Sequence, residues 1–228
     1  MAPSPGTAED EFERCLTERT AQLREALDRQ TMLLREAGHR VATNLQVIAS
    51  LMVLKARRTQ EGEARLALEG MADRIGALAV AHRLVGTEDS LARFALAELA
   101  EGLIGEIGAG LADDRVRLAT EIGMVALPAA MASPLALTIQ ELLSNAVRHA
   151  YPGDRQGEVR VLGRLVDDAL HLEIRDDGIG IDATAVNRQG FGRSLVEMIA
   201  RQVGGTVAWS DAEPGTRVVL TIPVAPGA

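Results

Sequence analysis

The sequence predicts two parts of different architecture, an α-helical hairpin followed by an α+β sandwich. Residues 8–58 contain no proline, and apolar side chains recur there every seven residues. Beyond residue 92 the pattern changes to short strands that alternate with helices, and helices grouped with a mixed or antiparallel sheet form an α+β sandwich. We therefore expect a flexible N-terminus (1–10), a helical domain (11–88) and an α+β domain (92–224).

Composition limits the classes of function. Hydrophobic residues make up 47% of the chain, which is enough for a substantial core. A net charge of −8 argues against nucleic-acid partners, which favour clustered basic surface. The single cysteine, Cys15, permits no intramolecular disulfide, which fits a reducing compartment. With no apolar run of membrane-spanning length and no signal-peptide pattern at the start, we expect a cytoplasmic protein.

The seven-residue pattern predicts one long helix that pairs with another helix. At 1.5 Å per residue such a helix spans roughly 75 Å, too much for a domain of this size to bury, so we expect a second copy of the chain as partner. Gly62 interrupts the pattern, and a second helix over 63–85 would complete an antiparallel hairpin. Two such hairpins form a dimeric four-helix bundle. The apolar rows are Leu27, Leu34, Val41 and Ile48, and Leu16, Leu23, Ala37 and Leu51.

The second part contains an ordered set of shorter elements. Pro134 suits the first turn of a helix, and Gly204 with Gly205 suits the end of one. Alternating apolar residues predict the strands. We expect helices over 94–107, from 134 to before Pro152, and over 194–203, and strands over 116–119, 159–165, 170–175, 207–209 and 217–222.

The helix before Pro152 carries polar residues at helical spacing. Glu141, Asn145 and either Arg148 or His149 are four and then three or four residues apart, so they line one face. A carboxylate, a carboxamide oxygen and a cation could together hold Mg²⁺ and a triphosphate, since Mg²⁺ favours hard oxygen ligands. The alternative is the ordinary solvent face of an amphipathic helix.

A glycine-rich segment follows the predicted strand 170–175. Asp176 with Gly178 and Gly180 would be an ordinary turn on its own, but the two glycines also permit close approach to a flat base, and the Asp176 carboxylate could accept from an amino group. Gly190 and Gly192 precede a helix, whose N-terminal amides favour phosphate. Thr216 after Gly215 adds a hydroxyl near the base.

Taken in order, these residues resemble the GHKL ATP-binding fold of histidine kinases, gyrase, Hsp90 and the mismatch-repair ATPases, over residues 94–223. The resemblance implies ATP and Mg²⁺ as cofactors. It further implies that Asp176 binds the adenine amino group, that Asn145 coordinates Mg²⁺ and that residues 181–192 form a short ATP lid. Glu141 stands where many histidine kinases have Asn, and in the ATPases of the superfamily a Glu on this helix activates water. We expect two groups of residues near the phosphates: the motif with Gly190, Gly192 and Leu195, and the pair Arg148 and His149.

Among the four histidines, His39 is the candidate phosphate acceptor. It occupies an outer heptad position, and Glu36 and Thr43 share its face. Neutral imidazole is a competent nucleophile, and an outer position is reachable by a mobile domain and by a partner. His82 lies on an apolar stripe, and His171 belongs to a predicted strand, so both are expected to be structural.

Residues 39–46 (H-R-V-A-T-N-L-Q) resemble the H-R-V-K-N-x-L-Q segment of a branch of bacterial sensor histidine kinases related to the HWE kinases. Ala42 replaces a Lys and Thr43 an Asn, and no W-x-E motif is present, since Trp209 lies elsewhere. The resemblance implies a homodimeric kinase core that phosphorylates His39 from ATP. It also implies transfer of the phosphoryl group to an Asp of a response-regulator receiver domain. Glu36 stands where that branch usually has an acidic residue, and the resemblance implies phosphatase chemistry at Thr43.

Two other functions share parts of these patterns. One is a non-catalytic histidine phosphotransfer or scaffold dimer with a degenerate ATP domain, which intact Asn145 and Asp176 argue against. The other is an anti-sigma-factor serine kinase, which lacks a His-bearing hairpin. The input signal is expected through the long N-terminal helix, from a sensor partner or from a segment outside this chain.

Overall fold

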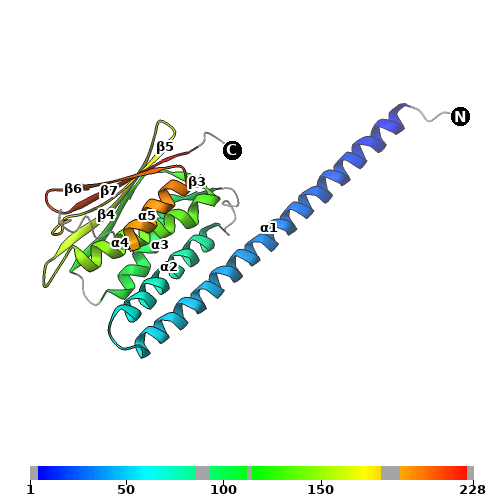
Figure 1. Cartoon of the computed structure of the whole chain (residues 1–228). Coiled ribbons are helices and arrows are strands. Elements are labelled where there is room, and N and C mark those ends of the chain that lie inside the picture. The colour runs from blue at the N-terminus through cyan, green and yellow to red at the C-terminus, as the bar shows by residue number, and fades with distance from the viewer. Residues whose placement is uncertain (1–4, 86–92, 112–114, 181–190, 225–228) are drawn as a thin grey trace.

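The computed structural model describes residues 5–85, 93–111, 115–180 and 191–224. In these ranges a helical hairpin leads into a layer of helices packed on a sheet (Figure 1). The helices are α1 (Pro5–Arg58), α2 (Glu63–Val85), α3 (Leu96–Gly110), the 3-10 turn η1 (Ala129–Met131), α4 (Ala132–His149) and α5 (Phe191–Gln202). The strands are β1 (Arg93–Ala95), β2 (Val116–Ile122), β3 (Ala126–Pro128), β4 (Gly157–Val166), β5 (Ala169–Asp176), β6 (Thr206–Asp211) and β7 (Thr216–Pro223).

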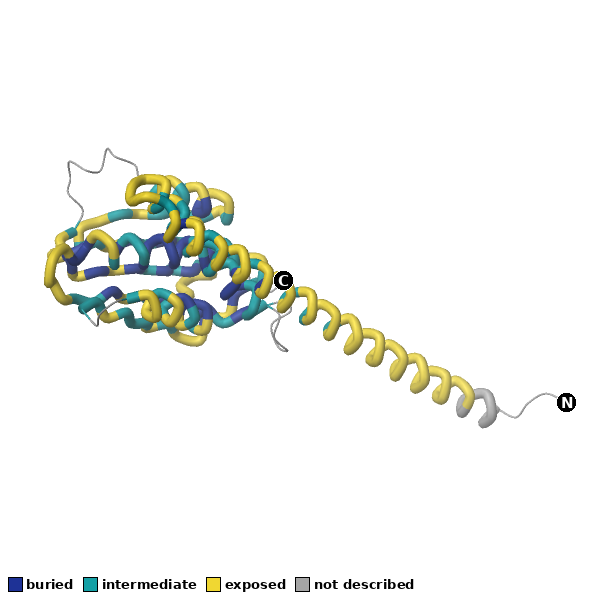
Figure 2. Tube along the Cα trace, turned by 90° about the horizontal axis from the view of Figure 1, so that it is seen from below, coloured by how far each residue is buried: buried dark blue, intermediate teal, exposed yellow. Residues whose placement is uncertain are grey.

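Helices α1 and α2 form the predicted antiparallel hairpin. Helix α1 begins at Pro5, inside the segment 1–10 for which we expected flexibility. Its N-terminal half projects away from the rest of the molecule (Figure 1), and Figure 2 shows that half exposed on all sides. Leu16, Leu23 and Leu27 are accordingly exposed. Within the described ranges, no helix combines the length and apolar character needed to cross a membrane.

The seam between α1 and α2 uses small side chains. Ala42 and Ala56 are 2% and 1% exposed, and Ala49 between them is partly buried. Side chains of this size let two helices approach closely. The predicted rows lie one residue away and remain on the surface, with Leu34 52% and Val41 42% exposed. The contact within the chain therefore leaves the larger apolar residues without a partner among the described residues.

The α+β sandwich is confirmed by the second part of the chain. Five strands form one sheet in the order β2-β4-β5-β7-β6, with β2 and β4 parallel and the other pairs antiparallel. Helices α3, α4 and α5 lie on one side of the sheet (Figure 1). Fully buried aliphatic residues fill the space between these layers: Leu96, Leu99, Leu103, Leu135, Ile139, Leu143, Leu170, Leu172, Leu220 and Ile222.

A small second sheet was not predicted. Arg93–Ala95 pairs antiparallel with Ala126–Pro128, where a helix had been expected from Phe94 onward. Phe94 is 3% and Leu127 0% exposed, so burial of this pair holds the strands together. Three residues are too few to show an alternating pattern, which is why the sequence did not reveal these strands. The predicted stop after α5 is present, since the Gly205 N–H donates to the Ala200 carbonyl at 2.8 Å.

Among the described residues, three ion pairs join the hairpin to the sandwich. Arg83 of α2 pairs with Glu106 of α3 at 3.0 Å, and the other two pairs link α2 to α4. Arg74 of α2 donates from Nε (3.0 Å) and from a terminal nitrogen (2.9 Å) to the Glu141 carboxylate of α4. Its guanidinium also lies 4.6 Å from the ring centroid of Phe191, the first residue of α5. Asp73, next to Arg74, pairs with Arg148 of α4. We call Asp73, Arg74, Glu141 and Arg148 the α2–α4 clasp.

The two pairs of the clasp differ in their exposure to solvent. The Arg74 and Glu141 side chains are 24% and 11% exposed, whereas those of Arg148 and Asp73 are 46% and 38% exposed. Burial raises the pKa of Asp73, and the charge of Arg148 offsets part of that rise. We call Asp73 and Arg148 the outer pair. Their side chains are exposed enough to solvent that larger or oppositely charged residues can replace them without steric clashes in the interface.

We predict that reversing one charge of the outer pair weakens the contact between hairpin and sandwich. Asp73→Arg or Arg148→Asp places like charges together and should cost about 1–2 kcal/mol of docking energy, while the double reversal restores most of it. Hydrogen exchange of the α2 and α4 amides measures the effect. The control is the Glu25–Arg29 pair on the projecting part of α1, 2.8 Å apart. Its reversal should leave that exchange unchanged, and equal effects at both pairs would contradict the prediction.

Candidate functional site

A cavity of about 300 Å³ lies between α4 and the end of the sheet. Helix α4 supplies one wall, and strands β5, β6 and β7 supply the other. Of the residues singled out in the sequence, Asn145, His149, Asp176, Gly180 and Thr216 all line it. The remaining lining is largely apolar: Leu142, Ala146, Ala150, Ile174, Ile179, Trp209 and Val218.

Asp176 is the fixed polar point of this cavity. It is the last residue of β5 and only 6% exposed. Its Oδ1 accepts hydrogen bonds from the N–H groups of Gly178 (3.0 Å) and Thr216 (3.1 Å). These two bonds orient the carboxylate, and its second oxygen, Oδ2, has no hydrogen bond among the described residues. Asp176 can therefore accept a hydrogen bond from a group in the cavity.

Two glycines hold the backbone around Asp176. A Cβ on Gly178 would lie 2.4 Å from the Ala150 carbonyl oxygen, so the loop packs directly on the end of α4. Gly215 has a φ of +101°, and a Cβ there would lie 1.9 Å from the Asp176 carbonyl oxygen. Both positions therefore exclude a side chain. Gly178 serves the packing of the loop, whereas Gly180 belongs to the cavity lining, as the motif predicted.

A second acidic residue stabilises this loop from the other side. Asp177 Oδ1 accepts from the Tyr151 hydroxyl (2.9 Å) and from the Glu158 N–H (2.9 Å). Tyr151 is 7% exposed, and burial together with this bond raises the pKa of its hydroxyl. No pattern in the sequence assigned a separate role to Asp177. Its hydrogen bonds show that it supports the loop while Asp176 faces the cavity.

The polar stripe of α4 divides into two sets. Asn145 and His149 line the cavity, whereas Glu141 and Arg148 do not. Glu141 is buried and its carboxylate is bound by Arg74, and Arg148 is bound by Asp73. Asn145 brings a carboxamide group to the cavity, with an oxygen of the kind that Mg²⁺ favours, whereas Glu141 is already bound by Arg74. The partners of both charged residues lie on α2, more than sixty positions away in sequence, and local spacing does not reveal them.

The start of α5 adjoins Glu141. A Cβ on Gly192 would lie 2.1 Å from Glu141 Oε1, so this glycine lets α5 approach the carboxylate. Leu195, one turn further along, is partly buried and does not line the cavity. Gly190 and most of the predicted lid lie outside the described residues. The N-terminal end of α5 is therefore close to Glu141 and Phe191, at the edge of the clasp.

Trp209 is a cavity residue that the sequence analysis missed. It lies on β6, opposite Val218 of β7. Its Nε1 is buried and has no hydrogen-bond partner among the described residues. A buried unpaired N–H costs about 1–3 kcal/mol, and indole N–H groups usually find a partner. The only signal in the sequence was that Trp209 is the single tryptophan.

The candidate phosphate acceptor lies apart from the cavity. His39 and Glu36 are exposed on α1, as predicted for an outer position. Thr43 shares this face, and its hydroxyl donates to the His39 carbonyl oxygen at 2.9 Å. His82 of α2 is partly buried. Neither His39 nor Glu36 lines the cavity, so the two halves of the predicted site are separate.

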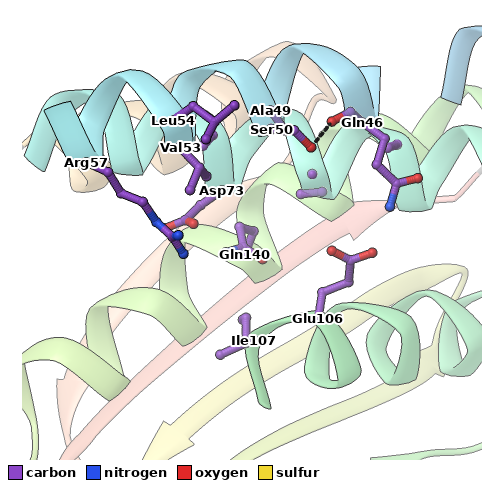
Figure 3. Close-up of a pocket in the computed structure, with 14 residues that line it drawn as sticks. Gln46, Ala49, Ser50, Val53, Leu54, Arg57, Asp73, Glu106, Ile107 and Gln140 are labelled. Carbon is purple, nitrogen blue, oxygen red and sulfur yellow. Dashed lines mark hydrogen bonds between the residues drawn. The ribbon is translucent and has the colours of Figure 1, made fainter. Parts of the chain in front are cut away.

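A larger groove of about 530 Å³ lies where the hairpin meets the sandwich. Figure 3 shows side chains of α1 facing Glu106 and Ile107 of α3 and Gln140 of α4 across it. Its lining includes Asp73 of the clasp but none of the residues predicted to bind nucleotide. The smaller cavity at Asp176 is therefore the candidate nucleotide site.

Comparison with known proteins agrees with this geometry. The sensor histidine kinase PdtaS of Mycobacterium tuberculosis is 29% identical over 205 residues, which cover 87% of this chain and 41% of that protein. This chain thus spans about two fifths of that relative's length. The solved Erythrobacter litoralis EL346 blue-light activated histidine kinase has a TM-score of 0.66 at 20% identity, covering 84% of this chain and 60% of that one. The solved histidine kinase domain of that protein has a TM-score of 0.63 at 19% identity, and the match covers 80% of this chain and 96% of that domain. These identities show a shared fold.

Two family models match successive parts of the chain. Residues 36–109 match the family described as histidine kinase (HisKA_2). Residues 131–226 match the family described as histidine kinase-, DNA gyrase B-, and HSP90-like ATPase (HATPase_c). The first match contains His39 and the hairpin, and the second contains the cavity and Asp176. The chain therefore contains a histidine kinase domain of the HisKA_2 family followed by an ATPase domain of the HATPase_c family.

Proposed function

We propose that this chain is the core of a two-component sensor histidine kinase that phosphorylates itself on His39 and passes the phosphoryl group to a response regulator. The observation that carries the proposal is the convergence of Asp176, Asn145, His149 and Thr216 on one cavity, in a chain that also presents His39 on an exposed helix. An anti-sigma-factor serine kinase would share the cavity, but the matched HisKA_2 hairpin favours histidine as acceptor.

The cavity is suited to the adenosine part of ATP. Its apolar walls pack against a flat base, and Asp176 Oδ2 accepts from the amino group of that base. Asn145 supplies an oxygen to Mg²⁺, and His149 lies one turn further along α4. The bound Mg²⁺ neutralises phosphate charge. Glu141 becomes a second oxygen donor only after Arg74 releases it.

In the proposed reaction, a ring nitrogen of His39 attacks the γ-phosphorus of ATP. A nitrogen–phosphorus bond forms, the bond between the γ-phosphorus and its bridging oxygen breaks, and ADP leaves. The phosphoryl group then moves to an Asp carboxylate of a receiver domain, and His39 is regenerated. Exposure of His39 makes both steps sterically accessible. Positioning is the main source of catalysis in such transfers.

The proposed transfer requires the ATP-binding domain to move along the hairpin. In an antiparallel pair that turns between Arg58 and Glu63, His39 lies level with about residue 82. The α+β domain contacts α2 at that level through Glu106, which binds Arg83. Glu141 and the start of α5 instead contact Arg74, eight positions away, or about 12 Å of helix rise. The α2–α4 clasp thus holds Glu141 and the start of α5 nearer to the hairpin turn than His39 is. Opening of the clasp would precede transfer.

We further propose a homodimer through the hairpin. Leu34, Val41, Ile48 and Leu51 are between 42% and 60% exposed on one side of α1. These residues form the predicted heptad rows, and a second copy would bury them in a four-helix bundle. The projecting half of α1 would then continue as a two-stranded coil, and a sensor partner could act through it.

The acceptor is tested by labelling. We expect acid-labile label from [γ-³²P]ATP and Mg²⁺ in the unaltered protein and none in His39→Gln, because the attacking nitrogen is removed. His82→Gln is the matched control, since it removes a histidine at the same level of the neighbouring helix. Label that persists in His39→Gln would exclude His39 as the acceptor.

The adenine contact is tested at Asp176. Asp176→Asn retains an oxygen for the two N–H donors but replaces the second oxygen by an NH₂ group, which faces the amino group of adenine unfavourably. We expect ADP to bind about tenfold more weakly or worse by calorimetry. Asp177→Asn is the control, because Asp177 faces away from the cavity. The affinity of this variant for ADP should change less than about twofold. Equal affinities in all three proteins would refute the assignment.

The proposed dimer is tested by introducing charged residues into the exposed apolar row of α1. Val41→Glu combined with Ile48→Glu places four carboxylates in the proposed bundle, and sedimentation equilibrium should show a monomer where the unaltered protein is a dimer. Met124→Glu is the control, since Met124 is fully exposed on the sandwich. Dimers that survive the double substitution would mean that another surface joins the chains.

A further inference from the structure

The segment 150–158, which leads from α4 into β4, packs against the loop that follows β5. The Ala150 carbonyl oxygen accepts a hydrogen bond from the Ile179 N–H at 3.0 Å. A Cβ on Gly157 would lie 2.3 Å from Asp177 Oδ1, so the two stretches of chain are in close contact there. Helix α4, which forms one wall of the cavity, is therefore fixed to the loop beside the other wall.

Arg155 makes two further contacts between this segment and the loop. One of its terminal nitrogens, Nη2, donates to the carbonyl oxygens of Asp177 (2.9 Å) and Gly178 (3.1 Å). A terminal nitrogen of arginine carries two N–H groups, so both bonds can form together. The two carbonyls belong to successive peptide groups, and Gly178 between them has no Cβ to restrain either one. One guanidinium nitrogen thus fixes two peptide groups.

The first of these peptide groups also orients Asp176. It joins Asp177 to Gly178, accepts from Arg155 at its carbonyl oxygen and donates from its N–H to Asp176 Oδ1 at 3.0 Å. Rotation of this peptide group would break both bonds. Linked hydrogen bonds also polarise one another, so the bond from Arg155 strengthens the bond to the carboxylate. Arg155 therefore acts on Asp176 through one peptide group.

The second peptide group is tied to α4. It joins Gly178 to Ile179, accepts from Arg155 and donates from its N–H to the Ala150 carbonyl oxygen, directly after α4. The position of the loop relative to the helical wall of the cavity therefore depends on a peptide group that Arg155 holds. Arg155 itself is exposed and does not line the cavity.

We propose that Arg155 is a positioning residue of the nucleotide site, which holds the loop so that Asp176 Oδ2 faces the amino group of adenine. The proposal rests on the proposed use of ATP. Arg155 takes no part in phosphoryl transfer, and its effect on binding passes through Asp176. It therefore strengthens the binding of a base that carries the amino group and has little effect on a base that lacks it.

The experiment compares ADP with purine riboside 5′-diphosphate, which lacks only the amino group. By calorimetry, the unaltered protein should bind ADP about tenfold more tightly than this analogue, because of the contact with Asp176. Arg155→Met keeps the stem of the side chain and removes the donors. We expect this variant to bind ADP about fivefold more weakly and the analogue within about twofold of the unaltered protein.

Arg93→Met is the matched control. Arg93 is also exposed, and it donates to a backbone carbonyl oxygen, that of Ala126, at 2.7 Å and outside the cavity. Its substitution should change neither affinity, and thermal unfolding verifies that both variants are folded. In the Asp176→Asn protein, Arg155→Met should weaken ADP binding less than about twofold, since the contact that Arg155 positions is already lost.

The analogue separates positioning from other roles of this arginine. Equal losses for ADP and for the analogue in Arg155→Met would mean that the residue supports the fold or meets the phosphates, and would overturn the proposal. Unchanged affinities for both would also overturn it, as would a fivefold loss that persists in the Asp176→Asn protein.

Failure of this proposal differs from failure of the proposed function. If the unaltered protein binds neither diphosphate, the use of ATP is wrong. If it binds both equally, the adenine contact of Asp176 is refuted and the role of Arg155 with it. If it prefers ADP and Arg155→Met keeps that preference in full, the nucleotide site stands and the role of Arg155 is refuted. A preference that falls in Arg155→Met but not in Arg93→Met supports both.

Discussion

The α2–α4 clasp sets the register of α4 along α2, beside the apolar residues Ala77, Val80 and Ala81 that α2 buries against the sandwich. Asp73 and Arg74 are adjacent and opposite in charge, and they meet Arg148 and Glu141, which lie two turns apart on one face of α4. A shift of α4 along α2 would unpair both contacts. Arg74 also stacks on Phe191, so the start of α5 is included in the same contact. One arginine thus links the hairpin, the central helix of the sandwich and the helix that follows the lid.

The energetics of such a contact suit reversible docking. Partly buried ion pairs gain little net free energy, because desolvation offsets much of their attraction. Unlike an apolar interface, they can separate in water at small cost, since each charged group is then hydrated. The proposed kinase needs the ATP-binding domain to leave Arg74 and reach His39. In this chain the clasp acts together with an apolar contact, since Ala77, Val80 and Ala81 of α2 are buried in the same core as the sandwich helices. The ion pairs set the register of the contact, and leaving it would also expose these apolar residues.

The sequence predicted features that depend on local spacing. The hairpin, the turn after Asp176 and the end of α5 at Gly204 and Gly205 follow from glycine and apolar periodicity within a few residues. It did not predict which side of α1 meets α2, because apolar rows such as Leu34 and Val41 are equally consistent with a second chain, and the intrachain seam uses alanines. Nor did it separate Asn145 from Glu141 on the polar stripe of α4. That difference comes from Arg74, in another domain.

The polar groups around the cavity differ in how completely the protein itself satisfies them, and this distinguishes support from recognition. Asp177 receives hydrogen bonds from Tyr151 and from the Glu158 backbone, so it stabilises the loop. Asp176 has one oxygen bonded twice and the other without a bond in the described structure. Trp209 Nε1 also lacks a hydrogen-bond partner in the described structure, but this nitrogen is buried and is not open to the cavity. Folding leaves few such groups, because each costs free energy. The unbonded oxygen of Asp176, at the edge of a largely apolar cavity, indicates a ligand that carries a hydrogen-bond donor.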